Sequence, residues 1–191
     1  MKLHPPFLTT ERLLLRTSTK EDVPQILEYF TINKCYLTPF YPRWDDNFFT
    51  QEYWQLQVEI NFHEFVNDRS LRLFIFLKNN PHKIIGTINF TNFVRGAAQH
   101  CHVGYSIAEM EQGKGYMTEA LQAAIAYVFQ ELKMHRIIAN YMPHNQRSGK
   151  LLKKLGFVVE GYARDFLLIN GEWQDHIIAS LINNNWMASG S

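Results

Sequence analysis

The spacing of apolar residues changes from a strand repeat to a helix repeat within residues 103–132. Val103, Tyr105 and Ile107 alternate with small or polar residues, which is typical of a strand. Farther along, apolar residues recur at intervals of three and four, which predicts a helix with one buried face. These residues are Ala120, Leu121, Ala124, Ile125, Val128, Phe129 and Leu132. The change of period predicts a loop between Ala108 and Thr118.

Similar patterns elsewhere predict an α/β (α+β) fold. Strands are expected over residues 10–16, 72–78, 84–93 and 135–142, and helices near residues 23–30, 51–65 and 145–156. Ser18 and Glu21 have the spacing of a capping box before the first helix. Residues 79–82 predict a hairpin loop, and Asn170-Gly171 predicts a tight turn between two final strands. These elements fit one domain over residues 1–191, with a core of residues 7–183 around one mixed sheet.

Residues 34–49 have no regular apolar period and are rich in aromatic residues. The segment also contains Pro39 and Pro42, which disfavour a long helix or strand. Its aromatic residues are Tyr36, Phe40, Tyr41, Trp44, Phe48 and Phe49. Two interpretations remain open: a hydrophobic lid over a site, or a structural loop whose rings are buried elsewhere.

The loop before the predicted helix has the features of a phosphate site. Gly113 and Gly115 let backbone N–H groups approach an anion, and the helix N-terminus carries partial positive charge. Thr118 is expected to cap this helix. The dinucleotide fingerprint does not fit, because Thr118 stands where its third glycine is needed, and the P-loop pattern is absent. The sequence therefore predicts a phosphate ligand of another class.

Composition favours a soluble protein of the cytoplasm. The chain has 191 residues, 46% of them hydrophobic, which is enough for one sizeable core. A net charge of +1 disfavours sequence-independent binding to nucleic acid. The two cysteines are too few for a disulfide framework, and residues 1–6 lack the apolar core of a signal peptide. No apolar run is long enough to span a membrane, so no membrane partner is expected.

Two motifs resemble the GNAT superfamily of N-acetyltransferases. Gln112-Gly113-Lys114-Gly115-Tyr116-Met117 is similar to its Gln/Arg-x-x-Gly-x-Gly/Ala loop, which cradles the pyrophosphate of acetyl-coenzyme A, although Met117 departs from the pattern. The superfamily pattern Asn-x-x-Ser/Ala-x-x-Leu-x-x-x-Gly-Phe is matched by Asn145, Ser148, Leu151 and Leu155-Gly156-Phe157. Within the superfamily, residues 7–181 resemble the ribosomal-protein-alanine N-acetyltransferases.

The resemblance implies a fold and a cofactor site. It implies a single GNAT-type domain whose mixed, mostly antiparallel sheet is flanked by helices and has two parallel central strands that diverge. Acetyl-coenzyme A is expected between these strands. The expected binding residues are Ser106, Ile107 and Ala108 through their backbone, Gln112, Gly113, Lys114, Gly115, Tyr116, Met117 and Thr118 around the pyrophosphate, and Asn145 from the opposite side. One backbone N–H is expected to polarise the thioester carbonyl.

The resemblance also implies an activity. It is transfer of the acetyl group to the N-terminal alanine α-amine of a small-subunit ribosomal protein, directly within a ternary complex. Direct binding of nucleic acid is not required for this reaction. Two alternatives remain open: a protein that binds acetyl-coenzyme A or a ribosomal partner without turnover, and an acetyltransferase for a small-molecule amine. The oligomeric state is not predicted.

Proton transfer is the least determined step. Many relatives carry a tyrosine seven residues after the asparagine to protonate the leaving thiolate, but that position here is Leu152. The resemblance makes Ser148 the catalytic candidate, and the alternative is a serine that only satisfies a backbone N–H at the helix start. Four residues are available as a base, and a water chain is a fifth possibility. The four are His102, His144, Glu160 and Asp165.

Other reactive residues point to no further chemistry. Cys101 lies between His100 and His102 on a predicted strand, where neighbouring side chains point to opposite faces, so a buried cysteine is favoured over a nucleophile. The histidines have no metal-ligand spacing, and no metal is expected. A basic group is expected either to meet the 3′-phosphate of the coenzyme or to form a solvated helix face. It consists of Arg147, Lys150, Lys153 and Lys154.

Overall fold

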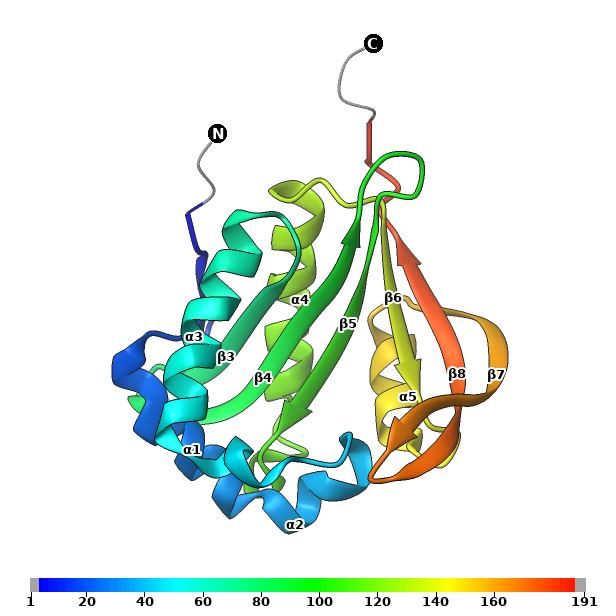
Figure 1. Ribbon diagram of the computed structural model, residues 1–191. Coiled ribbons are helices and arrows are strands. Elements are labelled where there is room, and N and C mark those ends of the chain that lie inside the picture. Colours follow the sequence, from blue (N-terminus) through cyan, green and yellow to red (C-terminus); the bar gives the residue numbers. More distant parts are fainter. Residues whose placement is uncertain (1–3, 188–191) are drawn as a thin grey trace.

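The computed structural model describes residues 4–187, and its centre is an eight-stranded sheet (Figure 1). The predicted domain limits at residues 1–3 and 188–191 lie outside the described part. The strands are β1 (Phe7–Thr9), β2 (Leu13–Arg16), β3 (Leu71–Leu77), β4 (Asn80–Val94), β5 (His100–Ile107), β6 (Arg136–Tyr141), β7 (Val158–Ile169) and β8 (Glu172–Ile182). Their order across the sheet is β1-β2-β3-β4-β5-β6-β8-β7.

All neighbouring strands are antiparallel except β5 and β6, which run parallel at the centre. The parallel pairing joins His100–Val103 to Arg136–Ala139 and then stops, although both strands continue. In Figure 1 the two strands lie close together at one end and diverge toward the other. The predicted mixed sheet with diverging parallel strands is therefore confirmed.

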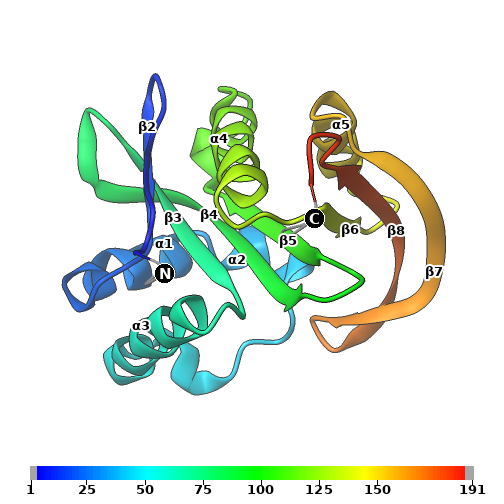
Figure 2. The same cartoon turned by 90° about the horizontal axis from the view of Figure 1, so that it is seen from above.

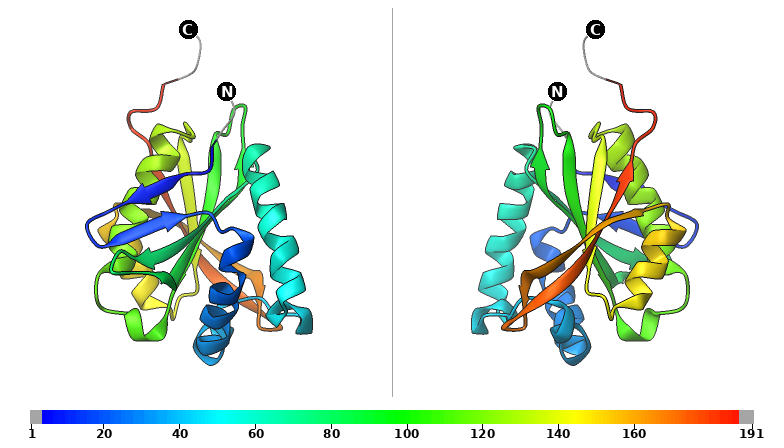
Figure 3. Two further views of the ribbon diagram at one scale, coloured as in Figure 1. Left: turned by 90° about the vertical axis from the view of Figure 1, so that its left-hand side faces the viewer. Right: turned by 90° about the vertical axis from the view of Figure 1, so that its right-hand side faces the viewer.

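Helices cover both faces of the sheet. They are α1 (Val23–Ile32), α2 (Lys34–Leu37), α3 (Gln51–Val66), α4 (Tyr116–Gln130) and α5 (Gln146–Lys154). Figure 2 shows α4 and α5 on one face and α1 and α3 on the other, and Figure 3 shows the same three layers from the sides. Alternation along β5 divides its side chains accordingly, because Val103 packs in the core cluster beside α4, whereas Ser106 Oγ lies 2.9 Å from Tyr29 OH of α1.

Several predicted boundaries were wrong for local reasons. Residues 10–16 do not form one strand, because Thr10 N–H donates to Leu13 O at 3.0 Å and closes a turn between β1 and β2. The capping interaction before α1 belongs to Thr19, whose N–H donates to Asp22 at 2.8 Å, and not to Ser18 and Glu21. The hairpin loop predicted at residues 79–82 is shorter, because β4 already begins at Asn80. The pairing of β3 with β4 shifts register twice, between Ile75 and Leu77, just before this turn.

The final hairpin was predicted correctly. Asn170 and Gly171 join β7 to β8, and both have positive φ angles, 48° and 87°. A two-residue turn of this kind matches the right-handed twist of the flanking strands. Asn170 N–H also donates to Tyr41 O at 2.9 Å, so the hairpin contacts the aromatic segment of residues 34–49.

The aromatic segment packs as a structural loop. It contains α2 and two 3₁₀ turns, Thr38–Phe40 and Asp46–Phe49. The aromatic rings of this segment pack around Phe30 of α1. The Phe30 ring is edge-on to Phe48, with centroids 5.0 Å apart, and is stacked on Trp54 of α3 at 5.2 Å. Tyr41 OH also donates to Ser106 Oγ of β5 at 2.8 Å, so this loop is tied to the central strand.

Candidate active site

The divergence of β5 and β6 leaves backbone groups on the inner edge of β5 without a strand partner. Ala108 N–H donates to Ile85 O of β4 at 2.8 Å, and a Cβ on Gly86 would lie 2.6 Å from Ser106 O. Backbone groups of Ser106 and Ala108 therefore face β4. Since backbone directions alternate along a strand, those of Tyr105 and Ile107 face the gap. Of the three backbone contacts expected here, only that of Ile107 is directed toward β6.

The glycine loop has the backbone conformation that a phosphate site needs. Gly113 and Gly115 have φ angles of 73° and 81°, which residues with a Cβ rarely adopt. Gly115, and not Thr118, is the N-cap of α4, because the helix begins at Tyr116. The N–H groups of the first turn have no partner within the helix, so they and the helix dipole face the loop. Met117 is 7% exposed in the core, so its departure from the motif leaves the backbone accessible.

Charged residues hold this loop from one side. Lys114 Nζ pairs with Glu111 Oε2 at 2.7 Å, and Lys83 Nζ pairs with the other oxygen at 3.2 Å. Burial alone would raise the pKa of Glu111, but hydrogen bonds from both lysines lower it, so the carboxylate is charged near neutral pH. The side chain of Lys114 is therefore held at Glu111, and the expected contribution of Lys114 to phosphate binding falls to its backbone.

Gln112 links the loop to α5 across the gap. Its Oε1 accepts a hydrogen bond from Arg147, the second residue of α5. Its Nε2 is buried and has no hydrogen-bond partner in the described part of the chain. An orphaned donor beside the loop fits an anionic oxygen as its missing acceptor.

A brace that the sequence did not predict fixes the loop from the other side. Glu119, in the first turn of α4, accepts hydrogen bonds from Thr10 Oγ1 at 2.6 Å, from Arg12 N–H at 2.8 Å and from Arg12 Nε at 2.7 Å. Arg12 also donates to Lys114 O at 2.9 Å and lies over the Tyr116 ring, 4.6 Å from its centroid. No sequence signal could have found this brace, because its residues are more than 100 positions apart.

Asn145 and Ser148 lie where β6 leads into α5. Asn145 is the N-cap of α5, and its Oδ1 accepts the N–H of Ser148 at 3.2 Å. Ser148 Oγ instead lies 2.7 Å from Tyr105 OH of β5. The cap of this helix is thus Asn145, and the side chain of Ser148 faces the opposite side of the gap. Leu152 is 2% exposed and packs in the core.

The face opposite α4 and α5 has an open position at the point of divergence. Gly104 of β5 is exposed, and a Cβ there would meet no atom within 4 Å. Asn140 of β6 follows Ala139, the last residue paired with β5, and its Oδ1 is buried without a hydrogen-bond partner among residues 4–187. Glycine within a strand is typical of a place where a ligand approaches the backbone. Neither residue was predicted.

The four base candidates are not brought together at this gap. Glu160 pairs with Arg136 at 2.6 Å and accepts from Ser180 Oγ at 2.6 Å, and these two hydrogen bonds lower its pKa. His102 lies in the part of β5 that pairs with β6. Burial is the main cause that lowers its pKa, and the neighbouring His100 lowers it further. His144 and Asp165 are exposed. None of the four hydrogen bonds with Ser148 or Tyr105 in the described chain.

Cys101 is fully buried, and burial raises the pKa of its thiol to about 12. The thiolate needed for a nucleophile is therefore disfavoured, and the interpretation as a core residue is confirmed. Among residues 4–187 there is no group of three or more His, Cys, Asp or Glu side chains that could hold a metal ion. No helix within those residues is both long and apolar enough to cross a membrane.

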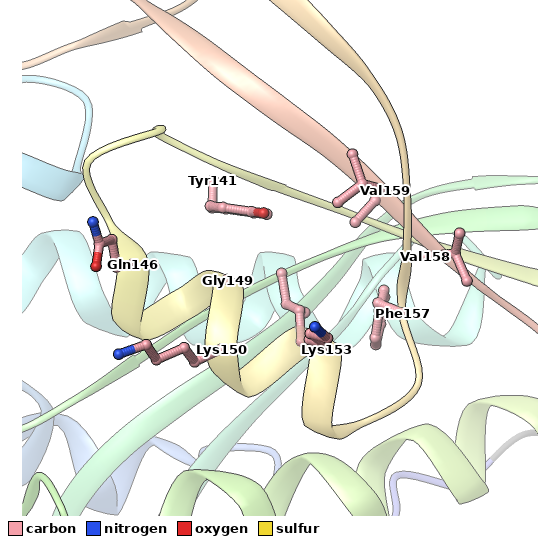
Figure 4. A pocket seen from close by; sticks show the side chains of 10 residues that line it. Tyr141, Gln146, Gly149, Lys150, Lys153, Phe157, Val158 and Val159 are labelled. Atoms are coloured by element: carbon pink, nitrogen blue, oxygen red, sulfur yellow. The ribbon is translucent and has the colours of Figure 1, made fainter.

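The basic residues of α5 do not form one cluster. Lys150 and Lys153 line a cavity of about 610 Å³ between α5 and the ends of β6, β7 and β8. Figure 4 shows them with Tyr141 and Val159 around this cavity. Ser148 is not among the residues that line this cavity.

Fold and loop together define an acetyltransferase of the GNAT type. The acetyltransferase (GNAT) domain family matches residues 12–158, and the chain belongs to this family. The chain is 43% identical over 179 residues to the [ribosomal protein uS5]-alanine N-acetyltransferase of Escherichia coli, covering 94% of this chain and 92% of the relative. The predicted family and acetyltransferase activity are therefore confirmed.

Solved structures agree with this assignment. The ribosomal-protein-S5-alanine acetyltransferase from Vibrio fischeri superposes with a TM-score of 0.91 at 37% identity, covering 96% of this chain and 100% of that one. RimJ of Mycobacterium smegmatis in complex with CoA-disulfide has a TM-score of 0.87 at 24% identity, covering 98% and 93% of the two chains. The second likeness shows the fold alone.

Proposed function

We propose that this enzyme transfers the acetyl group of acetyl-coenzyme A to the N-terminal alanine α-amine of a small-subunit ribosomal protein. The observation that carries the proposal is the 43% identity, over nearly all of both chains, to a relative that modifies the alanine of uS5. A net charge of +1 suits recognition of a protein segment better than recognition of ribosomal RNA. A ribosomal acceptor places the activity in the cytoplasm.

The proposed coenzyme site uses the loop and the gap together. N–H groups from Gly113 to Thr118 and the orphaned Nε2 of Gln112 bind the pyrophosphate at the start of α4. The backbone C=O of Ile107 accepts a hydrogen bond from the pantetheine arm as a neighbouring strand would. Asn145, at the start of α5, contacts the pantetheine arm from the opposite side. The bound coenzyme supplies an activated acetyl group.

The acceptor approaches from the opposite face, over Gly104. The open space at Gly104 leaves room for the first residue of a polypeptide, and the free acceptor oxygen of Asn140 suits an N–H donor of that residue. In this arrangement coenzyme and acceptor enter from different faces of the sheet. Both can then be bound at once, as direct transfer requires.

In the proposed chemistry, the free amine attacks the thioester carbonyl carbon. The C–N bond forms, the C–S bond breaks, and the sulfur leaves with the electron pair. Ser148 gives its hydroxyl proton to this sulfur, the nitrogen releases one proton to water, and water returns one proton that restores the Ser148 hydroxyl. The backbone N–H of Ile107 stabilises the negative charge that develops on the carbonyl oxygen. No acetyl-enzyme is needed, in keeping with the buried thiol of Cys101.

The proposed acceptor suits a site without a strong base beside it. An α-amine has a pKa of about 7.7 to 8.0, against about 10.4 for lysine, so roughly a tenth of it is already the free base at neutral pH. Deprotonating lysine costs roughly 3 to 4 kcal/mol more, at about 1.36 kcal/mol per pKa unit. Of the four base candidates, the carboxylate Glu160 pairs with Arg136, which removes it as a ready base. An α-amine is therefore the easier substrate.

The test is mass-spectrometric mapping of acetyl groups after incubation with acetyl-coenzyme A and a panel of purified ribosomal proteins. We expect label on the α-amine of one protein that begins with alanine, together with release of coenzyme thiol. Label on a polyamine in a parallel reaction, with no label on any of the proteins, contradicts the proposed acceptor. Absence of thiol release with every amine supports a binding protein without turnover instead.

A further inference from the structure

Two hydroxyl groups face each other across the gap between the halves of the sheet. Tyr105 lies on β5, beyond Val103, where pairing with β6 has ended. Ser148 lies on α5, which follows β6. The two oxygens are 2.7 Å apart although the residues are 43 positions apart. This contact joins the two sides of the gap on the face where the coenzyme is proposed to lie.

Either oxygen can be the donor in this contact, and the chemistry of the two groups favours the phenol. Tyr105 packs against the core cluster beside α4, and burial raises the pKa of its phenol to about 12. The phenol therefore keeps its single proton at neutral pH. The backbone N–H of Ser148 donates to Asn145 Oδ1 at 3.2 Å, which holds Ser148 in the first turn of α5. A phenol that donates to Ser148 Oγ leaves the serine proton free for another acceptor, whereas the reverse arrangement consumes it.

We propose that Tyr105 is a positioning residue that donates to Ser148 Oγ and directs the serine proton toward the sulfur of the coenzyme. The inference rests on the proposed role of Ser148 as proton donor. As the C–S bond breaks, the serine proton moves to sulfur and the phenolic proton moves to Ser148 Oγ. The resulting phenolate regains a proton from water, which has taken one from the attacking nitrogen. Both hydroxyl groups are thus protonated again at the end of the reaction.

Tyr105 also answers a chemical difficulty of a lone serine donor. An unassisted serine that gives up its proton becomes an alkoxide, a far stronger base than a phenolate. Transfer from Tyr105 places the charge on a delocalised ring instead. Leu152, one turn beyond Ser148 on α5, is buried and apolar and supplies no proton. The two hydroxyls therefore act as a unit.

The test compares Tyr105→Phe, Ser148→Ala and the double variant in single-turnover kinetics with saturating acetyl-coenzyme A. Tyr105→Phe keeps the ring and is expected to lower the rate of the chemical step roughly tenfold to hundredfold, with the coenzyme affinity changed less than about threefold. The double variant is expected to be no slower than Ser148→Ala, because both changes break one relay. Tyr127→Phe, which removes a hydroxyl from the far part of α4, is the matched control.

The outcomes distinguish the role of Tyr105 from that of Ser148. Multiplicative losses in the double variant, or a wild-type rate for Tyr105→Phe, overturn the role of Tyr105 and leave Ser148 as a donor. A wild-type rate for Ser148→Ala overturns the donor role of Ser148 and with it the inference. Coenzyme binding by calorimetry and thermal melting confirm that each variant is folded, and a structural loss alone would lower affinity and rate together.

Discussion

Glu119→Gln tests whether the contacts of the glycine loop matter for binding. The carboxylate holds Thr10 Oγ1 and Arg12 N–H on one oxygen and Arg12 Nε on the other. Glutamine can keep the first two contacts with its amide oxygen. Its NH₂ group then faces the Arg12 guanidinium, where two donors oppose each other. Arg12 loses its ion pair and is expected to release Lys114 O and the Tyr116 ring.

The magnitude follows from the single charged contact that is lost. A hydrogen bond to a charged group contributes about 1.5 to 3 kcal/mol when it is well shielded. The Arg12 side chain is 43% exposed and Glu119 is 17% exposed, so water recovers part of this energy. We expect a loss of about 1 to 2 kcal/mol in the free energy of unfolding. An unbraced loop must be ordered by the ligand, so coenzyme affinity is expected to fall roughly fivefold to thirtyfold.

The same contact predicts an acid dependence. Burial alone would raise the pKa of Glu119, but hydrogen bonds from Thr10 and Arg12 outweigh it and lower the pKa below the usual 4.5. A lowered pKa means that the stabilisation is complete above the unfolded value and is lost as pH falls through the folded value. The difference between wild type and Glu119→Gln is therefore expected to shrink below about pH 4.5.

Urea unfolding measures the stability change, and calorimetry with coenzyme A measures the affinity. Glu59→Gln on α3 is the matched control, because it removes the same charge from an exposed pair with Lys20, which lies in the 3₁₀ turn before α1. This control is expected to resemble wild type in both assays. Equal losses in the two variants, or unchanged coenzyme affinity in Glu119→Gln, would refute the proposed brace.

Three further predictions concern the site. Gly115→Val should abolish measurable coenzyme binding in calorimetry, because φ is 81° there and a branched side chain obstructs the loop; unchanged affinity would remove the phosphate assignment. Gly104→Val should raise the KM for an acceptor peptide at least tenfold while the KM for acetyl-coenzyme A changes little, and equal effects on both would contradict an acceptor subsite. With an α-amine acceptor, kcat/KM should rise through about pH 8 and stay level to about pH 10, because burial keeps the pKa of Tyr105 near 12; a fall beginning at pH 9 would contradict this.

Local pattern was sufficient for the elements around the site. The change of apolar period predicted β5, the loop and α4, and Asn170-Gly171 predicted the last hairpin, because these signals come from neighbouring residues. Local pattern was wrong about the helix start, because the backbone conformation of a single glycine decides it. Thr118 was expected to cap α4, but the positive φ of Gly115 lets the helix begin at Tyr116.

Contacts between distant residues were beyond prediction from one sequence. Nothing in the neighbourhood of Tyr105 indicates that Ser148 lies 2.7 Å away, and the Arg12 brace depends on how β2 lies beside α4. Backbone direction is also set by pairing, so the sequence could not show that Ile107 rather than Ala108 faces the gap. These features arise when the sheet is assembled.

The most direct measurement of the acceptor uses two peptides of one sequence that begins with alanine and contains one lysine. One peptide has a free N-terminus, and the other is blocked by a formyl group. Each is incubated with the enzyme and acetyl-coenzyme A, and the acetyl group is located by tandem mass spectrometry. We expect label confined to the alanine nitrogen of the free peptide, since its amine is the more easily deprotonated. Acetylation of the lysine in the blocked peptide at a comparable rate would contradict it.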